Sequence, residues 1–301
     1  MPDQTGRTAL VTGATSGLGL ASATALAARG ARVLLTARDP DRGSAALAHV
    51  RAVGGPRAEL VELDLADLAS VRRATAVVRE RTGDVLDVLL NNAGVMATPA
   101  AVTVDGFELQ IATNHLGHAA LTWLLMPALR AAPAARVVTV SSIAHRGGGL
   151  DVDDLHFTRR PYRPATAYSQ SKLANLLFAA ELDRRLRAAG HPVVSVAAHP
   201  GITGTDLLQN SLRRRSPLLA AVSDPVNRLF TQSVRTGVLP QLYAATAPQV
   251  RGGDYVGPRG PGEVVGRPAP ARRSAAARDP ELARRLWDVT ATATGVRPDP
   301  A

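Results

Sequence analysis

Short apolar runs alternate with longer amphipathic stretches along most of the chain. This alternation is typical of βαβ units, in which parallel strands are joined by helices. Runs such as Val85–Leu90 are apolar at nearly every position, as strands covered on both faces are. The pattern predicts strands at Thr8–Val11, Arg32–Thr36, Ala58–Leu63, Val85–Leu90, Arg136–Ser141, Val193–Ala197 and Asp254–Val256.

Helical periodicity fills the intervals between these strands. The longest predicted helix, Asp105–Ala131, contains the longest apolar stretch, Leu116–Leu129, which is too short to cross a membrane. We therefore expect an α/β fold with a doubly wound parallel sheet of about seven strands, helices on both faces and no integral membrane span. The other predicted helices are Leu18–Arg29, Arg42–Val53, Leu68–Arg81 and Ala165–Ala189.

No linker rich in proline or glycine interrupts this alternation before about residue 200, so residues 1–301 are expected to form one domain. Within it we expect a substrate-loop region at about 202–250 and a C-terminal extension at about 257–301. The piece Gly257–Ala277 is rich in Gly, Pro, Ala and Arg, a composition that favours a mobile surface loop.

Composition narrows the range of functions. The residues are 46% hydrophobic but only 3% aromatic, which predicts an aliphatic core, and the net charge of +10 comes from scattered arginines. A nucleic-acid partner is not expected, because such binders show a clustered basic stripe. Cysteine is absent, which excludes disulfides and thiolate catalysis. With no secretory signal, this favours a cytoplasmic protein. His115 and His118 lack a second group of ligands, so no metal site is expected.

A glycine-rich loop follows the first predicted strand and leads directly into a helix: Thr12-Gly13-Ala14-Thr15-Ser16-Gly17-Leu18-Gly19. Glycines at such a turn let the backbone approach a pyrophosphate, whose charge then lies at the helix N-terminus. The strand–loop–helix context is the one this motif requires. The loop therefore predicts a dinucleotide site.

Lys172 is the only lysine among 35 basic residues. It follows Tyr168 by four positions, which on a helix places both side chains on the same face. An ammonium group beside a tyrosine lowers the pKa of the phenol, which then serves as a proton donor or acceptor. A chance pair on a solvated helix is the alternative that these two residues alone leave open.

These features together resemble the classical short-chain dehydrogenases/reductases, from residue 7 to about residue 206. Ser141–His145 and Ser171–Asn175 are similar to the retinol-dehydrogenase-like branch. The resemblance implies a Rossmann-type fold and an NAD(P)-dependent oxidoreductase. The motifs, in the order of the family, are Thr12-Gly13-x-x-x-Gly17-x-Gly19, Asn91-Asn92-Ala93-Gly94, Asn114, Ser141-Ser142, Tyr168-x-x-x-Lys172, and Pro200-Gly201 followed by Thr205.

The resemblance also implies four catalytic residues. Tyr168 gives a proton to a carbonyl oxygen or takes one from an alcohol, and Ser142 binds that oxygen, with Ser141 as the alternative. Lys172 lowers the pKa of Tyr168 and binds the nicotinamide ribose. Asn114 holds a water molecule in a proton relay to Lys172.

The implied cofactor is NADP(H) in preference to NAD(H). An NAD enzyme places a carboxylate at the end of the second strand, where this chain has Ala37, and Arg38 follows to meet a 2′-phosphate. Asp39 is better explained as a helix N-cap before Pro40, and Arg38 has the alternative of an ordinary surface arginine. Asp64 meets the adenine, caps the next helix, or does both. The implied cofactor contacts are Thr12, Gly13, Ser16, Gly17, Leu18, Gly19, Arg38, Asp64, Leu65, Asn91, Ala93, Gly94, Tyr168, Lys172, Pro200, Gly201 and Thr205, with Thr203 as the alternative to Thr205.

The expected activity is transfer of a hydride between nicotinamide and a small lipophilic carbonyl or alcohol substrate. The leucines of Asp206–Asp224 favour a lipophilic substrate, unless they only pack a lid helix. A non-catalytic nucleotide-sensing module and an epimerase or dehydratase on the same fold are the alternatives. The insertion Ala144–Thr166 either forms a wall of the substrate pocket or masks an oligomer surface, which leaves a homo-oligomer open.

Overall fold

The computed structural model describes residues 1–203 and 232–300. They contain one eight-stranded sheet with the order β3-β2-β1-β4-β5-β6-β7-β8. All neighbouring strands pair in parallel except β8, which pairs antiparallel to β7. The predicted doubly wound sheet is confirmed, with one strand more than expected. The strands are β1 (Thr8–Val11), β2 (Arg32–Ala37), β3 (Ala58–Glu62), β4 (Val88–Asn91), β5 (Arg136–Val140), β6 (Val194–Ala198), β7 (Tyr255–Pro258) and β8 (Pro268–Pro270).

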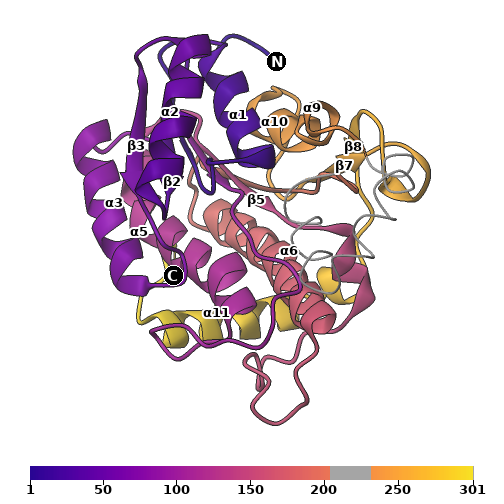
Figure 1. Cartoon of the computed structure of the whole chain (residues 1–301). Helices are drawn as coiled ribbons and strands as arrows, with labels where there is room; N and C mark the ends of the chain where they lie inside the picture. Colours follow the sequence, from indigo (N-terminus) through magenta and orange to yellow (C-terminus); the bar gives the residue numbers. More distant parts are fainter. Residues whose placement is uncertain (204–231, 301) are drawn as a thin grey trace, which may run out of the picture.

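Helices cover both faces of this sheet (Figure 1). Helices α1, α2, α9 and α10 lie on one face, α3, α5 and α6 lie on the other, and α11 packs against the outer side of α6. No helix of the described ranges is long and apolar enough to cross a bilayer. The helices are α1 (Gly17–Ala27), α2 (Pro40–Gly54), α3 (Leu68–Thr82), α4 (Leu109–Ile111), α5 (Gly117–Ala131), α6 (Pro164–Ala188), α9 (Val234–Gly237), α10 (Leu239–Thr246) and α11 (Pro280–Thr294).

Alternate residues of each strand supply the two halves of the core. Val11 of β1 packs with Leu26 of α1 on one face, whereas the adjacent Leu10 packs with Val71 of α3 and Leu125 of α5 on the other. All five side chains are fully buried. Burying a side chain of this size stabilises a fold by about 1.5–3 kcal/mol. Both faces therefore contribute to holding the carboxyl ends of the strands, where side chains of the site emerge.

The predicted helix Asp105–Ala131 is wrong at its start and in its middle. Gly106 has φ +84, so the chain turns there, and helix α4 begins only after Glu108, whose carboxylate accepts hydrogen bonds from the backbone N–H groups of Gln110 and Ile111. Residues Ala112–Leu116 then form a π-helical turn before α5. Such turns are rare and are frequent at functional sites.

The predicted mobile loop Gly257–Ala277 is also wrong. Its first residues complete β7, and its middle contains the edge strand β8. Proline lacks a backbone donor, but an edge strand tolerates it because one side of the strand needs no partner. Between the two strands, hydrogen bonds from Arg259 N to Arg267 O and from Gly260 N to Val265 O close a turn.

Candidate active site

The glycine-rich loop joins β1 to α1 at the carboxyl edge of the sheet. Gly13 and Gly17 have φ values of +64 and +53, a region that favours glycine. A Cβ atom on Gly19 would lie 2.2 Å from Gly13 O, so only glycine lets the helix approach the loop this closely. Ser16 caps α1 without a side-chain hydrogen bond, and Leu18 lies in the first turn. This cradle fits a pyrophosphate at the helix N-terminus.

Thr12 joins this loop to the Asn91-Asn92-Ala93-Gly94 motif. The buried Thr12 Oγ1 accepts hydrogen bonds from Asn92 N (2.9 Å) and Ala93 N (3.0 Å), although the two segments are 80 positions apart. The side chain of Asn91 instead donates to Thr122 Oγ1 (3.0 Å) inside the protein. His118 Nε2 lies 2.9 Å from Thr12 Oγ1, a contact between residues 106 positions apart that no motif in the sequence indicates.

Arg38 and Asp64 face each other beyond the ends of β2 and β3. The side chain of Arg38 is 72% exposed, and its Nη1 lies 3.9 Å from Asp64 Oδ2. The alternative that Asp64 caps the following helix is wrong, because the N-cap of α3 is Asp67 and Asp64 instead accepts from Ala66 N. Asp39 does cap α2, with Pro40 at the first helical position.

Leu65 lies buried next to Asp64, under the start of α5. A Cβ atom on Gly117 would lie 2.3 Å from Leu65 O, so the loop after β3 and the helix touch directly. This contact fixes the loop after β3 against the first turn of α5.

Ser142, Tyr168 and Lys172 meet where β5 ends against α6. Lys172 Nζ lies 5.7 Å from the centre of the Tyr168 ring and donates to Val140 O (3.2 Å). The Ser142 hydroxyl caps a short 3-10 helix by accepting from Ala144 N (3.1 Å). The Ser141 hydroxyl is buried and donates to Lys172 O (2.7 Å), which ties β5 to α6.

Burial decides the charge state of Tyr168 and Lys172. It raises the pKa of Tyr168 to about 12, and the nearby Ser142 side chain acts in the opposite direction. It lowers the pKa of Lys172 to about 8. The predicted net lowering of the pKa of Tyr168 is therefore wrong for the protein alone, because the loss of hydration on burial outweighs any lowering by the ammonium group at this distance. Tyr168 is a protonated phenol at neutral pH.

Asn114 lies fully buried in the π-helical turn and joins three segments. Its Oδ1 accepts from Val95 N (2.8 Å), and its Nδ2 donates to Val95 O (2.9 Å) and to Ser171 Oγ (2.8 Å). A Cβ atom on Gly94 would lie 3.1 Å from Asn114 Oδ1 and 3.4 Å from Lys172 Nζ. The predicted relay residue is thus adjacent to the lysine, with Gly94 between them.

Pro200 and Gly201 follow β6 at the same edge of the sheet. Gly201 has φ +70, and a Cβ atom on it would meet Val264 O. Pro200 O accepts from Gln232 Nε2, and Thr203 pairs with Gln232 as an isolated bridge. Thr205 and the leucines of Asp206–Asp224 lie outside the described residues.

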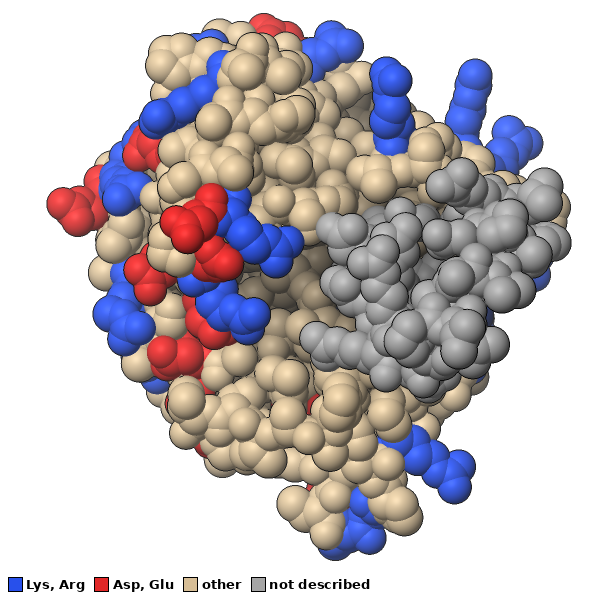
Figure 2. Space-filling model, viewed as in Figure 1, with Lys and Arg blue, Asp and Glu red and all other residues tan. Residues whose placement is uncertain are grey.

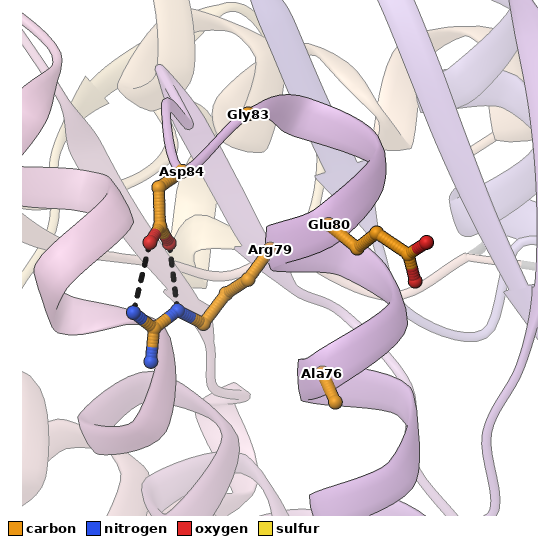
Figure 3. Close-up of a pocket in the computed structure, with 5 residues that line it drawn as sticks. All are labelled: Ala76, Arg79, Glu80, Gly83 and Asp84. Atoms are coloured by element: carbon orange, nitrogen blue, oxygen red, sulfur yellow. Dashed lines mark hydrogen bonds and ion pairs between the residues drawn. The ribbon is translucent and has the colours of Figure 1, made fainter.

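Figure 2 shows a hollow near the middle of this face, close to the positions of β5 and α6 in Figure 1. Basic and acidic side chains flank it on the side of β2, β3 and α3. The pocket in Figure 3 is a separate feature at the C-terminal end of α3, where Arg79 pairs with Asp84. Because α3 leads into β4, that pocket lies at the opposite edge of the sheet. In the described ranges, no group of histidine, aspartate and glutamate side chains is arranged to hold a metal ion.

The chain is similar to known proteins in sequence and in fold. Residues 7–216 match the family model described as short chain dehydrogenase. Mouse polyprenol dehydrogenase is 43% identical over 294 residues, covering 95% of this chain and 83% of that protein. Human retinol dehydrogenase 13 is 39% identical over 292 residues, covering 97% and 85%. A crystal structure of an uncharacterised protein from Mycobacterium paratuberculosis superposes with a TM-score of 0.81 and 44% identity, covering 99% of this chain and 96% of that one.

Proposed function

We propose, from the premise that this chain belongs to the short-chain dehydrogenase/reductase family, that it is an NADP(H)-dependent oxidoreductase of lipophilic alcohols or carbonyls. The family match and the similarity to retinol dehydrogenases identify the chain as an NAD(P)-dependent oxidoreductase acting on CH–OH groups. The proposal goes further by naming the cofactor, the substrate class and Tyr168 as the general acid/base. The observation that carries it is the meeting of Ser142, Tyr168 and Lys172 beside the dinucleotide loop.

Tyr168 gives the proton to the substrate oxygen during reduction and takes it back during oxidation. Its pKa of about 12 keeps the proton on the phenol until the substrate oxygen gains negative charge. Ser142 rather than Ser141 orients that oxygen, since the Ser141 hydroxyl is buried and already donates to Lys172 O. The nicotinamide, when bound, supplies or receives the hydride.

Lys172 and Asn114 assist Tyr168 in the proposed reaction. A lysine of pKa about 8 is mostly charged at neutral pH, which favours negative charge developing on the tyrosine oxygen. Asn114 fixes the loop beside Lys172 and places the π-helical turn next to it. The proposed cofactor contacts are Thr12, Gly13, Ser16, Gly17, Leu18, Gly19, Arg38, Asp64, Leu65, Asn91, Ala93, Gly94, Tyr168, Lys172, Pro200, Gly201 and Thr205.

Two observations support the finer choices of cofactor and substrate. Ala37 offers no carboxylate to ribose hydroxyls, whereas the exposed guanidinium of Arg38 suits bidentate binding of a 2′-phosphate. The relatives are named for polyprenol and retinol, which are both apolar alcohols. A lipophilic alcohol or its carbonyl product is therefore the proposed substrate.

The test is a spectrophotometric assay of the purified protein with retinol, a polyprenol and their aldehydes, each with NADP(H) and NAD(H). We expect turnover of at least one pair and a higher kcat/KM with NADP(H). Absence of turnover with both cofactors, in a protein that still binds NADPH, would favour the nucleotide-sensing alternative. Preference for NAD(H) would contradict only the proposed role of Arg38 and not the proposed oxidoreductase activity.

A further inference from the structure

Segment Gly260–Ser274 lies against both loops that carry the proposed reaction. It contacts the Pro200–Ile202 loop after β6 and also the turn after β5 that contains Ser142. The composition of this segment predicted a mobile loop, but its backbone is held by a turn around Pro261–Glu263 and by β8. A segment that only connected two strands would not need these contacts, so they indicate a further role.

Glu263 is the centre of this contact. Its Oε2 accepts from His199 Nε2 (3.2 Å) and from Arg146 Nη2, and its Oε1 accepts from Arg272 N (2.9 Å). The Glu263 side chain is only 13% exposed. It has φ +60, a conformation uncommon outside glycine that persists only where surrounding contacts hold it.

His199 connects Glu263 to the loop after β6. Burial lowers the pKa of His199 to about 4, so the ring is neutral at neutral pH although Glu263 acts in the opposite direction. A neutral imidazole has one donor and one acceptor nitrogen. Nε2 therefore donates to Glu263, and Nδ1 accepts from Gly201 N (3.2 Å).

The residue after Glu263 holds the same loop through its backbone. Val264 O accepts from Ile202 N (3.0 Å), and it lies so close to Gly201 that a Cβ atom there would collide with it. Gln232 adds a bond from its Nε2 to Pro200 O, and its Oε1 accepts from Gly266 N (3.3 Å). The turn 260–266 thus contacts Pro200, Gly201 and Ile202 either directly or through one side chain.

Arg146 and His145 connect the segment to Ser142. Arg146 Nη2 donates to Glu263 and to Arg272 O (3.1 Å). His145 Nδ1 lies 2.7 Å from Ser142 O, and its Nε2 accepts from Ser274 N (3.4 Å). Both residues belong to the 3-10 helix that the Ser142 hydroxyl caps.

We propose that segment Gly260–Ser274 is a positioning clamp, and that Glu263 is the positioning residue at its centre. Its carboxylate fixes the Pro200–Gly201 loop through His199 and the Ser142 turn through Arg146. The assignment rests on the proposed function of those two loops, because it is that function which makes their spacing matter.

The test replaces Glu263 by glutamine, which keeps the size but offers one acceptor oxygen to three donors. Displacements of about 1 Å at a reacting centre cost up to about 100-fold, so we expect kcat/KM to fall about 10- to 100-fold. We also expect the Gly201 and Ile202 amides to exchange hydrogen about tenfold faster, because local opening sets that rate. Glu181→Gln is the matched control, since Glu181 is a buried carboxylate on α6 that binds Arg184 and Arg185.

Glu263→Gln with unchanged exchange and kcat/KM within about twofold of the unmutated protein would overturn the clamp. The exchange measurement needs no substrate, so it decides the clamp even if no turnover is found and the proposed function fails. Arg146→Met removes the contact between Glu263 and the Ser142 turn but keeps the contact between Glu263 and His199. The variant should fold, because the Arg146 side chain is 33% exposed. It should lower kcat about tenfold while the KM for NADPH and the exchange of Gly201 stay unchanged. A change in that KM with kcat intact would contradict the assignment of Arg146 to Ser142.

Discussion

Two regions of the molecule build the carboxyl edge of the sheet, and they do so in different ways. Before residue 203, the site consists of short motifs at the ends of consecutive strands, such as the Thr12–Gly19 loop after β1 and Ser142 after β5. After residue 232, the chain contributes single side chains that reach across long separations, such as Glu263 to His199 and Gln232 to Pro200. In the proposed function the first region supplies the reacting groups, and in the proposed clamp the second region holds them in place.

The largest effect should separate chemistry from support within the first region. Tyr168→Phe removes only the phenolic oxygen, so kcat should fall about 10²- to 10⁴-fold, the usual contribution of a general acid. Binding of NADPH, followed by its fluorescence, should stay nearly unchanged. Tyr243→Phe on α10 is the control, because Tyr243 contacts Gln249 far from α6. Near-normal turnover in Tyr168→Phe would remove Tyr168 from the mechanism.

Helix α11, which also belongs to the second region, should affect stability and not turnover. Trp287 of α11 is 2% exposed, lies 4.9 Å from the Trp123 ring and stacks on Phe178 at 5.6 Å. Trp287→Ala should therefore lower the free energy of unfolding by about 3–5 kcal/mol, as truncation of a buried aromatic residue does. Urea denaturation measures it, and kcat of the folded protein should stay close to normal.

Arg284→Ala is the control for Trp287→Ala on the same helix. Arg284 pairs with Glu281 and Asp288 on the exposed face of α11. Such exposed pairs contribute little to stability because solvent screens them. Equal losses from both variants would mean that α11 is not anchored by its aromatic face.

A smaller effect tests whether the first region depends on motifs alone. His118 lies between Thr12 Oγ1 (2.9 Å) and Asn114 O (3.0 Å), and burial lowers its pKa to about 4. Burial likewise lowers the pKa of His115 to about 3. In the unfolded chain the pKa of a histidine is about 6.5. Between about pH 4 and about pH 6.5 the unfolded state therefore binds more protons than the folded state. The stability present above about pH 6.5 is lost as the pH falls through this interval.

Between about pH 6.5 and pH 5 each buried histidine should cost about 2 kcal/mol of unfolding free energy. His118→Gln should therefore reduce the fall by about that amount, measured by urea denaturation at both pH values. His49→Gln, at an exposed position on α2, should leave the fall unchanged. An identical pH dependence in His118→Gln would show that His118 is not held neutral in the fold.

How much the sequence could predict follows the same division. The strand Thr8–Val11 and the Asp39–Pro40 helix cap are determined by residues that are neighbours in the sequence. Both were predicted correctly. The π-helical turn at Ala112–Leu116 was not, because ordinary helical periodicity continues through it. The pKa of Tyr168 was predicted in the wrong direction, since burial depends on the whole fold.

The second region was hardest to predict for a related physical reason. Nothing in a glycine- and proline-rich segment indicates that Glu263 will meet His199, 64 positions earlier in the chain. The same holds for His118, whose partner Thr12 lies 106 positions away. Such contacts arise only once the sheet and its helices are assembled, so motifs in the sequence indicate the proposed reacting groups but not the residues that position them.

The last effect concerns Arg38, which belongs to the first region and has a largely exposed side chain. Its side chain is 72% exposed, and a pair with Asp64 at 3.9 Å leaves it able to turn toward a 2′-phosphate. A charged hydrogen bond contributes about 1.5–3 kcal/mol. Arg38→Ala should therefore lower kcat/KM with NADPH about 10- to 100-fold and leave that with NADH nearly unchanged.

Steady-state kinetics with both cofactors measures this preference. Arg42→Ala, an exposed arginine on the first turn of α2, is the control for a general loss of positive charge and should change neither value. Because Ala37 supplies no carboxylate, the last residue of β2 offers no acceptor for the ribose hydroxyls of NADH once Arg38 is gone. The variant should accordingly lose its preference without gaining activity, and a rise of kcat/KM with NADH would point to Asp39 as a ribose ligand instead of a helix cap.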